Sequence, residues 1–324
     1  MTSPDLPAEL KAALDAKLEG VSLNEAAGRA ALISQTYRSG GSSAAIRSKA
    51  DALAYALARM PATYAAVTAC LNALCDIRPD FTPGSLLDAG AGPGTASWAA
   101  AEALPSLRNF RLIDANGALR ALALDLGRES TRLHEMNYQR GEALTTLATA
   151  QAADFIVASY MIGEIADTKQ AELAELLWDR TNDTLLVVEP GTPAGYARII
   201  ALRARLVALG AHVAAPCPHD GKCPLQTPDW CHFTQRLPRL RAHKQLKGAD
   251  LPFEDEKFSY VALTRSPPLQ RPARVLAQPV VNKAAISVKI CSASGISNAV
   301  APRRDKTSYQ RLKKISWGDA VFDE

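Results

Sequence analysis

The stretch Leu87-Asp88-Ala89-Gly90-Ala91-Gly92-Pro93-Gly94-Thr95 decides the fold of this 324-residue chain. It ends a short apolar run, Ser85–Ala91, that predicts a buried strand, and it precedes an alanine-rich segment that predicts a helix over Thr95–Leu104. Glycines at alternate positions let the backbone turn tightly and approach a ligand closely. A glycine-rich loop between a strand and a helix is typical of nucleotide-binding folds, so we expect a nucleotide-like cofactor at this loop.

Beyond the loop, apolar runs alternate with amphipathic segments, which predicts strands and helices in turn. The predicted strands lie at Phe110–Ala115, Leu133–Tyr138, Asp154–Tyr160, Thr184–Glu189, Ala211–Ala215 and Phe258–Thr264. The predicted helices lie at Gly117–Gly127, Gln170–Asp179 and Tyr196–Leu209. This alternation favours a mostly parallel sheet with helices on both faces, so the predicted fold class is α/β, with a doubly wound Rossmann-like sheet.

The composition divides the chain into three predicted parts. Residues 1–82 are rich in alanine and predict a helical N-terminal region with a break at 39–43. Residues 83–265 would form the cofactor-binding domain, which carries at 216–257 an insertion rich in Cys, His, Pro and charge. Residues 266–324 would form a small, basic, strand-rich C-terminal extension, because 273–295 has strand-like composition.

An acidic residue completes the cofactor signature. Asp114 ends the second predicted strand about twenty residues past the glycines, where a carboxylate can accept hydrogen bonds from ribose hydroxyls. The loop reads G-x-G-x-G behind an acidic residue, whereas dinucleotide enzymes more often show G-x-G-x-x-G, so an NAD-linked oxidoreductase is the weaker alternative. The pattern resembles the class I S-adenosylmethionine-dependent methyltransferases. In that resemblance the cofactor-binding residues are Asp88, Gly90, Gly92, Gly94 and Asp114.

The segment that would hold a methyl acceptor is less distinctive. Base-methylating enzymes often carry an Asn/Asp-Pro-Pro-Tyr/Phe motif after the fourth strand, or a nucleophilic cysteine in a comparable loop. Here the residues are Ala158-Ser159-Tyr160-Met161-Ile162-Gly163-Glu164. The sequence therefore supports cofactor binding better than catalysis, and it assigns no catalytic residue.

Cysteines concentrate in the insertion. Cys217, Cys223 and Cys231 lie within fifteen polar, proline-rich residues, and Cys291 lies in the strand-like C-terminal part. Thiolates grouped in this way suit either zinc or an iron–sulfur cluster. The C-x₅-C spacing is wider than the usual zinc knuckle and favours the larger cluster, with zinc as the alternative and His219 and His232 as further zinc ligands.

Charge is distributed unevenly along the chain. Residues 1–210 contain 19 Lys and Arg against 23 Asp and Glu, whereas residues 211–324 contain 18 against 10. A basic C-terminal third, with basic runs at 236–247 and 303–317, suggests contact with a polyanion such as RNA. No apolar stretch approaches the roughly 20 residues of a membrane span, and the acidic N-terminus lacks the features of a transit peptide. We therefore expect a monomeric, cytoplasmic, bacterial protein with no membrane contact.

The Cys-rich insertion resembles one family closely. Its landmarks are Cys-Pro-His-Asp-Gly-Lys-Cys-Pro-Leu (217–225), Asp-Trp-Cys-His-Phe (229–233) and Phe-Glu-Asp-Glu-Lys-Phe-Ser-Tyr (253–260). They resemble the Rsm22 family of small-ribosomal-subunit proteins, which comprises mitochondrial methyltransferase-like factors and their bacterial relatives. The resemblance extends from about residue 30 to the C-terminus and includes Cys291 and the basic tail.

The resemblance implies a function and a set of ligands. It implies assembly of the small ribosomal subunit through contact with its ribosomal RNA, an S-adenosylmethionine pocket at Asp88–Gly94, and a cubane 4Fe-4S cluster. The cysteines that match the family's cluster ligands are Cys217, Cys223, Cys231 and Cys291. Three functions stay open: an rRNA methyltransferase, a non-catalytic assembly factor that keeps cofactor and cluster for structure, and a zinc-bearing methyltransferase with no ribosomal role. A radical S-adenosylmethionine enzyme is disfavoured, because the sequence has no C-x₃-C-x₂-C motif.

Overall fold

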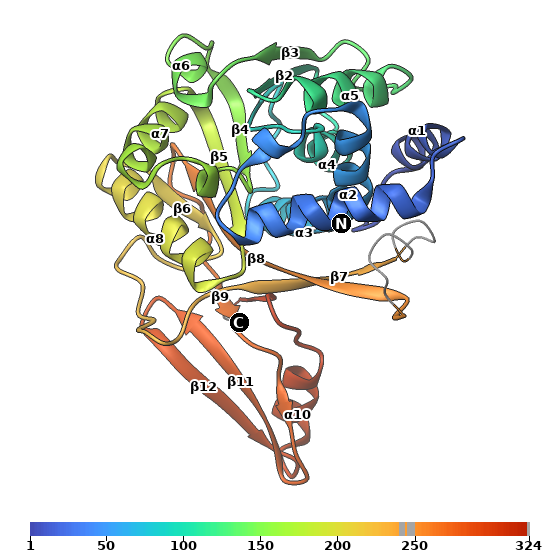
Figure 1. Cartoon of the computed structure of the whole chain (residues 1–324). Helices are drawn as coiled ribbons and strands as arrows, with labels where there is room; N and C mark the ends of the chain where they lie inside the picture. The colour runs from blue at the N-terminus through green and yellow to red at the C-terminus, as the bar shows by residue number, and fades with distance from the viewer. Residues whose placement is uncertain (240–243, 245–249, 323–324) are drawn as a thin grey trace.

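The computed structural model describes residues 1–239, 244 and 250–322. A sheet with the strand order β3-β2-β1-β4-β5-β8-β6 forms its centre, and β7 also pairs with β8 (Figure 1). The strands are β1 Ser85–Ala89, β2 Asn109–Asp114, β3 Asn137–Arg140, β4 Ala153–Ser159, β5 Thr181–Pro190, β6 His212–Ala215, β7 Phe233–Pro238 and β8 Phe253–Thr264. Strands β1 to β5 are parallel, and β8 is antiparallel to β5, β6 and β7.

The strand order reverses direction between β1 and β4, which defines a doubly wound sheet and places ligand sites beyond the carboxyl ends of these strands. The predicted α/β fold class is confirmed as a methyltransferase-like Rossmann sheet. The third strand was predicted to begin four residues too early and to end two residues too early, since β3 covers Asn137–Arg140. Only Tyr138 of this short strand is buried, so the apolar residues before it misplaced the prediction.

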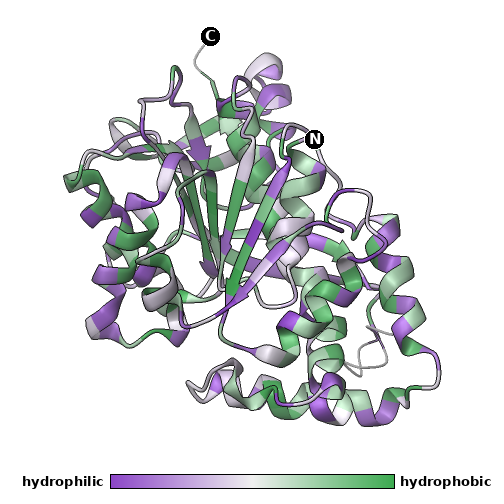
Figure 2. Ribbon diagram, turned by 90° about the horizontal axis from the view of Figure 1, so that it is seen from above, coloured by the Kyte–Doolittle hydropathy of each residue, from purple (hydrophilic) through white to green (hydrophobic). Residues whose placement is uncertain are grey.

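Helices cover both faces of the sheet. One face carries α1 Ala8–Leu18, α2 Leu23–Arg38, α3 Lys49–Ile77, α4 Thr95–Ala103 and α5 Gly117–Gly127, and the other carries α6 Ala143–Leu147, α7 Asp167–Asp179 and α8 Pro193–Ala208. Two short 3₁₀ turns lie at Ser43–Ala45 and Ile162–Glu164. The central strands are mostly hydrophobic in Figure 2, as expected of strands buried on both faces. The helical N-terminal region and its break are confirmed.

The long helix α3 links the N-terminal region to the sheet. It begins at a capping box in which Ser48 and Asp51 bond each other's backbone N–H groups, an arrangement that typically stabilises a helix by about 1 kcal/mol. The helix continues through Pro61, and its alanine-rich surface is largely buried against α2, α4 and β8. Small side chains let α3 lie close to the sheet.

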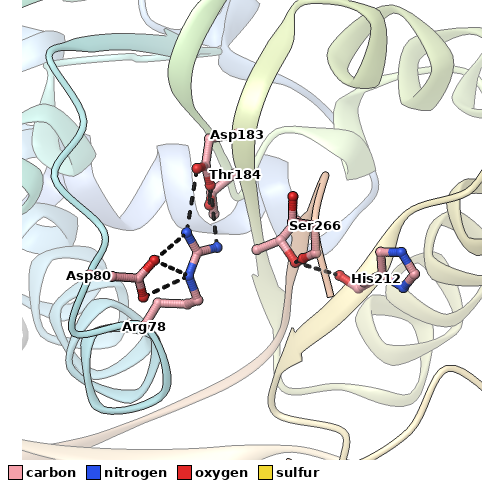
Figure 3. A network of polar contacts seen from close by, with 7 residues as sticks. Arg78, Asp80, Asp183, Thr184, His212 and Ser266 are labelled. Carbon is pink, nitrogen blue, oxygen red and sulfur yellow. Dashed lines mark hydrogen bonds and ion pairs between the residues drawn. The ribbon is translucent and has the colours of Figure 1, made fainter. Parts of the chain in front are cut away.

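The opposite end of the sheet is tied together by the polar network in Figure 3. Arg78, directly after α3, donates from Nε to Asp80 Oδ1 at 3.0 Å and from Nη2 to Asp183 Oδ2 at 3.4 Å. Thr264, at the end of β8, donates to the carbonyl of His212 at 3.3 Å. These contacts join α3, β5, β6 and β8 at the edge far from the glycine loop.

The C-terminal part forms a separate small antiparallel sheet below the main one (Figure 1). Its elements are β9 Ala273–Val275, β10 Val280–Val281, β11 Ala285–Ser292, β12 Gly295–Pro302, α10 Lys306–Lys313 and β13 Ala320–Val321. Tyr309 and Leu312 of α10 pack on the apolar face of β11. The predicted strand-rich extension is confirmed, while the helix α10 was not foreseen, because basic residues dominate its sequence.

The insertion is more regular than its composition suggested. In the described part of the expected irregular segment 216–257, residues 216–232 form a loop next to the cysteines, and β7 then pairs along the first half of β8. This half of β8 carries Glu254, Asp255 and Glu256, and its partner strand is also polar. Charged residues on a two-stranded ribbon hid the strand pattern, so this prediction was wrong in its extent.

Candidate functional site

The glycine loop after β1 has the backbone conformation that its sequence predicts. Gly90, Gly92 and Gly94 all have positive φ, at +68°, +54° and +79°. Only glycine adopts this region at little cost, so each of the three is required by the turn itself. Gly94 is the N-terminal cap of α4, and the loop therefore delivers the chain directly into a helix.

Asp88 lies beneath this loop and not in the pocket above it. The carboxyl group is fully buried, and its Oδ2 accepts hydrogen bonds from the N–H and the Oγ of Ser97 at 3.1 and 2.8 Å. Burial raises the pKa of Asp88 to about 7, although the bonds from Ser97 oppose that rise. Asp88 is not among the residues that line the pocket, and it connects β1 to the first turn of α4.

Asp114 lines the pocket from the end of β2. Its Oδ2 accepts from the N–H of Gly92 at 2.9 Å, and its Oδ1 accepts from the N–H of Asn116 at 2.7 Å. Burial raises the pKa of Asp114, while the two backbone N–H groups counteract that effect. The carboxylate is therefore held rigidly beside the loop, and each oxygen keeps lone pairs for a ligand.

The pocket has a volume of about 770 Å³, within the range of small-molecule sites. Loops that follow β1, β2, β3 and β4 form one wall, and α2, α3 and the segment between them form the other. That segment is fixed by two side chains. Glu164 accepts from the N–H and the Oγ of Ser43 at 2.9 and 2.8 Å, and Asn116 donates to the carbonyls of Ser43 and Ile46 at 2.7 and 2.9 Å.

Two residues that support or line the pocket were not found from the sequence. Tyr138 is buried and donates from its hydroxyl to the carbonyl of Gly92 at 2.6 Å, so it supports the loop from β3. Arg59, on α3, lines the pocket and pairs with Glu256 of β8 at 3.0 Å. Neither residue belongs to a recognisable motif, and the pairing of Arg59 with β8 exists only in the folded chain.

All four cysteines predicted as metal ligands line one small cavity. Cys217, Cys223 and Cys231 come from the loop between β6 and β7, and Cys291 comes from β11 of the C-terminal sheet. The cavity volume is about 30 Å³, comparable to the share of one water molecule in the liquid. Thiols separated by 74 residues in sequence, from Cys217 to Cys291, are thus brought together by the fold.

The surroundings of this cavity are positively charged. Arg203 of α8 and Arg274 of β9 both line it and are both buried. Burial raises the pKa of Cys217, and the charge of Arg203 acts in the opposite direction. Burial likewise raises the pKa of Cys291 to about 11, with a further contribution from the neighbouring thiols. Cys217 and Cys291 are therefore neutral thiols, and the two arginines beside them would stabilise added negative charge.

The donor spacing does not match a single metal ion. Within the described residues, no three His, Cys, Asp or Glu side chains lie close enough to hold one ion. Tyr196 donates to Cys223 Sγ at 3.3 Å, and Ser259 donates to the carbonyl of Cys231 at 2.8 Å. The four thiols thus surround a shared space but are spaced more widely than the ligands of one ion, and the metal-binding character of the insertion stays a proposal.

The two predicted basic runs differ in their surroundings. In the first run, Arg236 pairs with Asp255 at 2.8 Å and Arg239 with Glu254 at 3.3 Å. Arg241, His243 and Lys247 of that run lie outside the described residues. In the tail, α10 and its flanks expose five basic side chains that form no ion pair with a described residue. They are Arg303, Arg304, Lys306, Lys313 and Lys314.

Residues 49–322 match the protein-family model described as mitochondrial small ribosomal subunit Rsm22. The chain belongs to the Rsm22 family. The resemblance carried by the cysteine landmarks is therefore confirmed for this Rsm22 member.

Curated relatives are similar in sequence over most of this Rsm22-family chain. The human ribosome assembly protein METTL17, mitochondrial, is 30% identical over 290 residues, which covers 83% of this chain and 62% of that protein. The Rsm22-cox11 tandem protein 2, mitochondrial, of Schizosaccharomyces pombe is 24% identical and covers 82% and 42%, respectively. The chain thus spans less than two thirds of either relative. Both relatives are named as mitochondrial, and the expected bacterial cytoplasmic location stays a prediction.

Solved methyltransferases resemble this Rsm22-family chain only at low similarity. Magnesium protoporphyrin IX methyltransferase of Synechocystis is 10% identical with a TM-score of 0.41, covering 63% of this chain and 84% of that one. Human N-acetylserotonin methyltransferase is 12% identical with a TM-score of 0.41, covering 69% and 58%. The fold assignment therefore rests on the strand order. In the described part of the chain, no helix has the length and apolar character of a membrane span.

Proposed function

We propose that this chain is an S-adenosylmethionine-binding, iron–sulfur-containing factor that acts in assembly of the small ribosomal subunit by binding its rRNA. The observation that carries the proposal is the pairing of two sites on an Rsm22-family chain. A glycine loop and Asp114 face one pocket, and four cysteines line a second cavity.

The cofactor part of the proposal follows from the chemistry of the pocket. The loop backbone at Gly90 and Gly92 lines the pocket where the methionine part would bind, with Gly94 ending the turn, and Asp114 offers acceptors to the ribose hydroxyls. Asp88 would support the loop from below. Calorimetric titration of the chain with S-adenosylmethionine tests this part, and absence of binding would refute it.

The pocket supports cofactor binding more than methyl transfer. Glu164 already accepts two hydrogen bonds from Ser43, and the hydroxyl of Tyr160 is bonded to Glu256 at 3.1 Å. Neither side chain after β4 is therefore poised to take a proton from an acceptor. Transfer of a labelled methyl group from the cofactor to small-subunit rRNA would instead establish the rRNA methyltransferase.

The cysteine cavity fits an iron–sulfur cluster in its donor set. Four thiolates are the usual ligands of a 4Fe-4S cluster, and such a centre is negatively charged, which Arg203 and Arg274 would stabilise. Cys217, Cys223, Cys231 and Cys291 would hold it. Since the cavity volume is only about 30 Å³, the loop at 216–232 would have to move outward to admit a cluster. The bound group would then join the loop to the C-terminal sheet.

We expect the chain, purified without oxygen, to absorb broadly near ~400 nm and to contain about four iron and four sulfide per molecule. Cys217→Ser should remove most of this absorption, because it deletes one ligand. Cys75→Ser is the matched control, since Cys75 is a half-buried thiol on α3 outside the cavity, and it should leave the spectrum unchanged. Stoichiometric zinc in a colourless protein would instead support the zinc-bearing methyltransferase.

The proposed RNA contact lies on the tail helix α10. Lys306, Lys313 and Lys314 are exposed and form no ion pair with a described residue, so they can neutralise phosphates. They carry no means of reading a base, so this surface would position the RNA and not select its sequence.

Neutralising these lysines is expected to weaken binding to small-subunit rRNA and to reduce its salt dependence. The triple variant Lys306→Gln/Lys313→Gln/Lys314→Gln should lower the slope of log K against log salt by about 2–3. The control variant removes three exposed cations from the body of the protein, Arg38→Gln/Arg128→Gln/Lys169→Gln. Filter binding at several salt concentrations measures both. Equal losses in the two variants would mean that net charge, and not α10, determines the affinity.

A further inference from the structure

Arg59 is a cation that lines the cofactor pocket. The contacts proposed so far for the glycine loop and Asp114 give it no role. Its only hydrogen bond to a described residue runs from Nη2 to Glu256 Oε1 at 3.0 Å. The Nε and Nη1 atoms have no hydrogen-bond partner among the described residues, and 34% of the side chain is open to solvent. The guanidinium is therefore anchored on one side and free to bind a ligand on the pocket side.

The position of Arg59 is next to the glycine loop. Strands β1 and β4 are neighbours in register, so the loop at Gly90 lies beside Tyr160 and Met161. A Cβ atom placed on Gly90 would lie only 2.6 Å from Met161 Cβ. The guanidinium carbon of Arg59 lies 5.9 Å from the centroid of the Tyr160 ring. Arg59 and the glycine loop therefore lie against two consecutive residues, Tyr160 and Met161.

Most other charged residues of the pocket lie toward its ribose end, and the acidic Glu164, which follows β4, is bonded to Ser43. Asp114 follows β2, Glu142 follows β3, and Arg140 donates to the carbonyl of Ala115 at 3.1 Å. The segment that leads to Arg47 and Lys49 is bonded to Asn116, also after β2. Among the described lining residues, Arg59 is thus the basic side chain at the methionine end.

We infer that Arg59 binds the carboxylate of the cofactor's methionine part, with Glu256 as the residue that positions the guanidinium. The inference rests on the proposed binding of S-adenosylmethionine. A guanidinium presents planar N–H donors that match a carboxylate, and the methionine carboxylate is the anionic group of this cofactor. The acidic ribose end and the basic methionine end would then each complement a different part of one ligand.

Glu256 and Tyr160 hold Arg59 in place from two further elements. Glu256, on β8, is 9% exposed, and its Oε1 accepts from both Arg59 and the hydroxyl of Tyr160. Tyr160 has a φ of +56°, a left-handed conformation that is uncommon for an aromatic residue. Its N–H donates to the carbonyl of Val188 at 2.7 Å. Strained residues of this kind persist where the surrounding structure fixes them, as at ligand sites.

A comparison of two ligands tests this assignment. S-adenosylmethionine and its decarboxylated analogue differ only in the methionine carboxylate. Arg59→Gln is expected to weaken binding of S-adenosylmethionine roughly 10- to 100-fold, the usual effect of losing a charge-assisted hydrogen bond. The same substitution should change the affinity for the decarboxylated analogue by less than about threefold. Calorimetric titration of wild type and variant with both ligands measures the four constants.

Two further variants separate binding from folding. Arg59→Lys keeps the charge and should recover part of the discrimination between the two ligands. Arg59→Gln/Glu256→Gln removes the ion pair without leaving a charge buried alone, so it serves if Arg59→Gln does not fold. If wild type binds neither ligand, the proposed cofactor is wrong. If wild type binds S-adenosylmethionine and the folded variants discriminate between the ligands as well as wild type does, Arg59 does not bind the carboxylate.

Discussion

Replacing Gly90 with alanine is expected to reduce the affinity for S-adenosylmethionine by more than about 100-fold. Gly90 has a φ of +68°, and an alanine in this region costs about 1–2 kcal/mol in backbone strain. The added Cβ would also lie 2.6 Å from Met161 Cβ and 2.8 Å from its Cγ. Met161 cannot retreat easily, because the N–H of Ile162 is bonded to buried Glu189 at 3.1 Å. The loop must therefore shift away from the pocket.

Gly210→Ala is the matched control for this substitution. Gly210 follows α8 with a φ of +88°, and no atom of the described part of the chain lies within 4 Å of an added Cβ. It should lower the free energy of unfolding by about 1 kcal/mol and leave cofactor affinity unchanged. Thermal unfolding of both variants measures the cost of backbone strain. Calorimetric titration of both variants measures the loss of cofactor affinity that follows from a displaced loop. Wild-type affinity in Gly90→Ala would mean that the cofactor does not contact this loop.

The glycine loop was predictable because its chemistry is local. Three glycines two residues apart, between an apolar run and an alanine-rich segment, leave the backbone few alternatives. All three have the positive φ that the turn requires, and Asp114 lies beside the loop as the strand spacing implied. The strands that are buried on both faces were equally clear, because they are continuous apolar runs.

The remainder of the pocket depends on contacts between distant segments. Arg59 and Glu256 are 197 residues apart in sequence. Arg59 belongs to no motif, and Glu256 lies in the family landmark at 253–260, which carries no sign of a role in the pocket. Glu256 lies in the charged half of β8, which the sequence suggested was a loop. Their pairing arises because α3 packs beneath β8, a packing that alanine content permits but does not specify.

The cysteine cavity falls between these two cases. The spacing of Cys217, Cys223 and Cys231 marked a ligand site from local sequence. Cys291 could be added only through the family resemblance, since a single cysteine in a strand carries no signal by itself. Arg203 and Arg274, which set the charge of the cavity, were not foreseen because isolated arginines are common on surfaces.

Asp88→Asn is expected to remove a pH dependence from the stability of the protein. Asp88 is fully buried, and its Oδ1 has no hydrogen-bond partner among the described residues. Its pKa is raised to about 7, mainly by burial, against a value of 3.8 for a free aspartate. The folded state therefore holds a proton on Asp88 that the unfolded state has released. Stability from this group is complete below about pH 4 and is lost as the pH rises toward about 7.

The expected magnitude is large for a single side chain. A shift of about 3 pKa units corresponds to roughly 4 kcal/mol, because each unit is worth about 1.4 kcal/mol. Asparagine has the same shape and cannot ionise, and its carbonyl oxygen can still accept from Ser97. The variant and wild type should therefore have similar free energies of unfolding near pH 4.5. Near pH 8 the variant should be more stable by up to that amount.

Denaturant unfolding of wild type and Asp88→Asn at several pH values between 4.5 and 8 measures this difference. Other groups titrate in the same range, but they contribute equally to both proteins and cancel in the comparison. Ser97→Ala is a second variant for the same measurement. It removes the hydrogen bond from the Ser97 hydroxyl to Asp88 Oδ2 and should raise the pKa of Asp88 further. A difference that stays constant with pH would show that Asp88 is ionised in the folded protein.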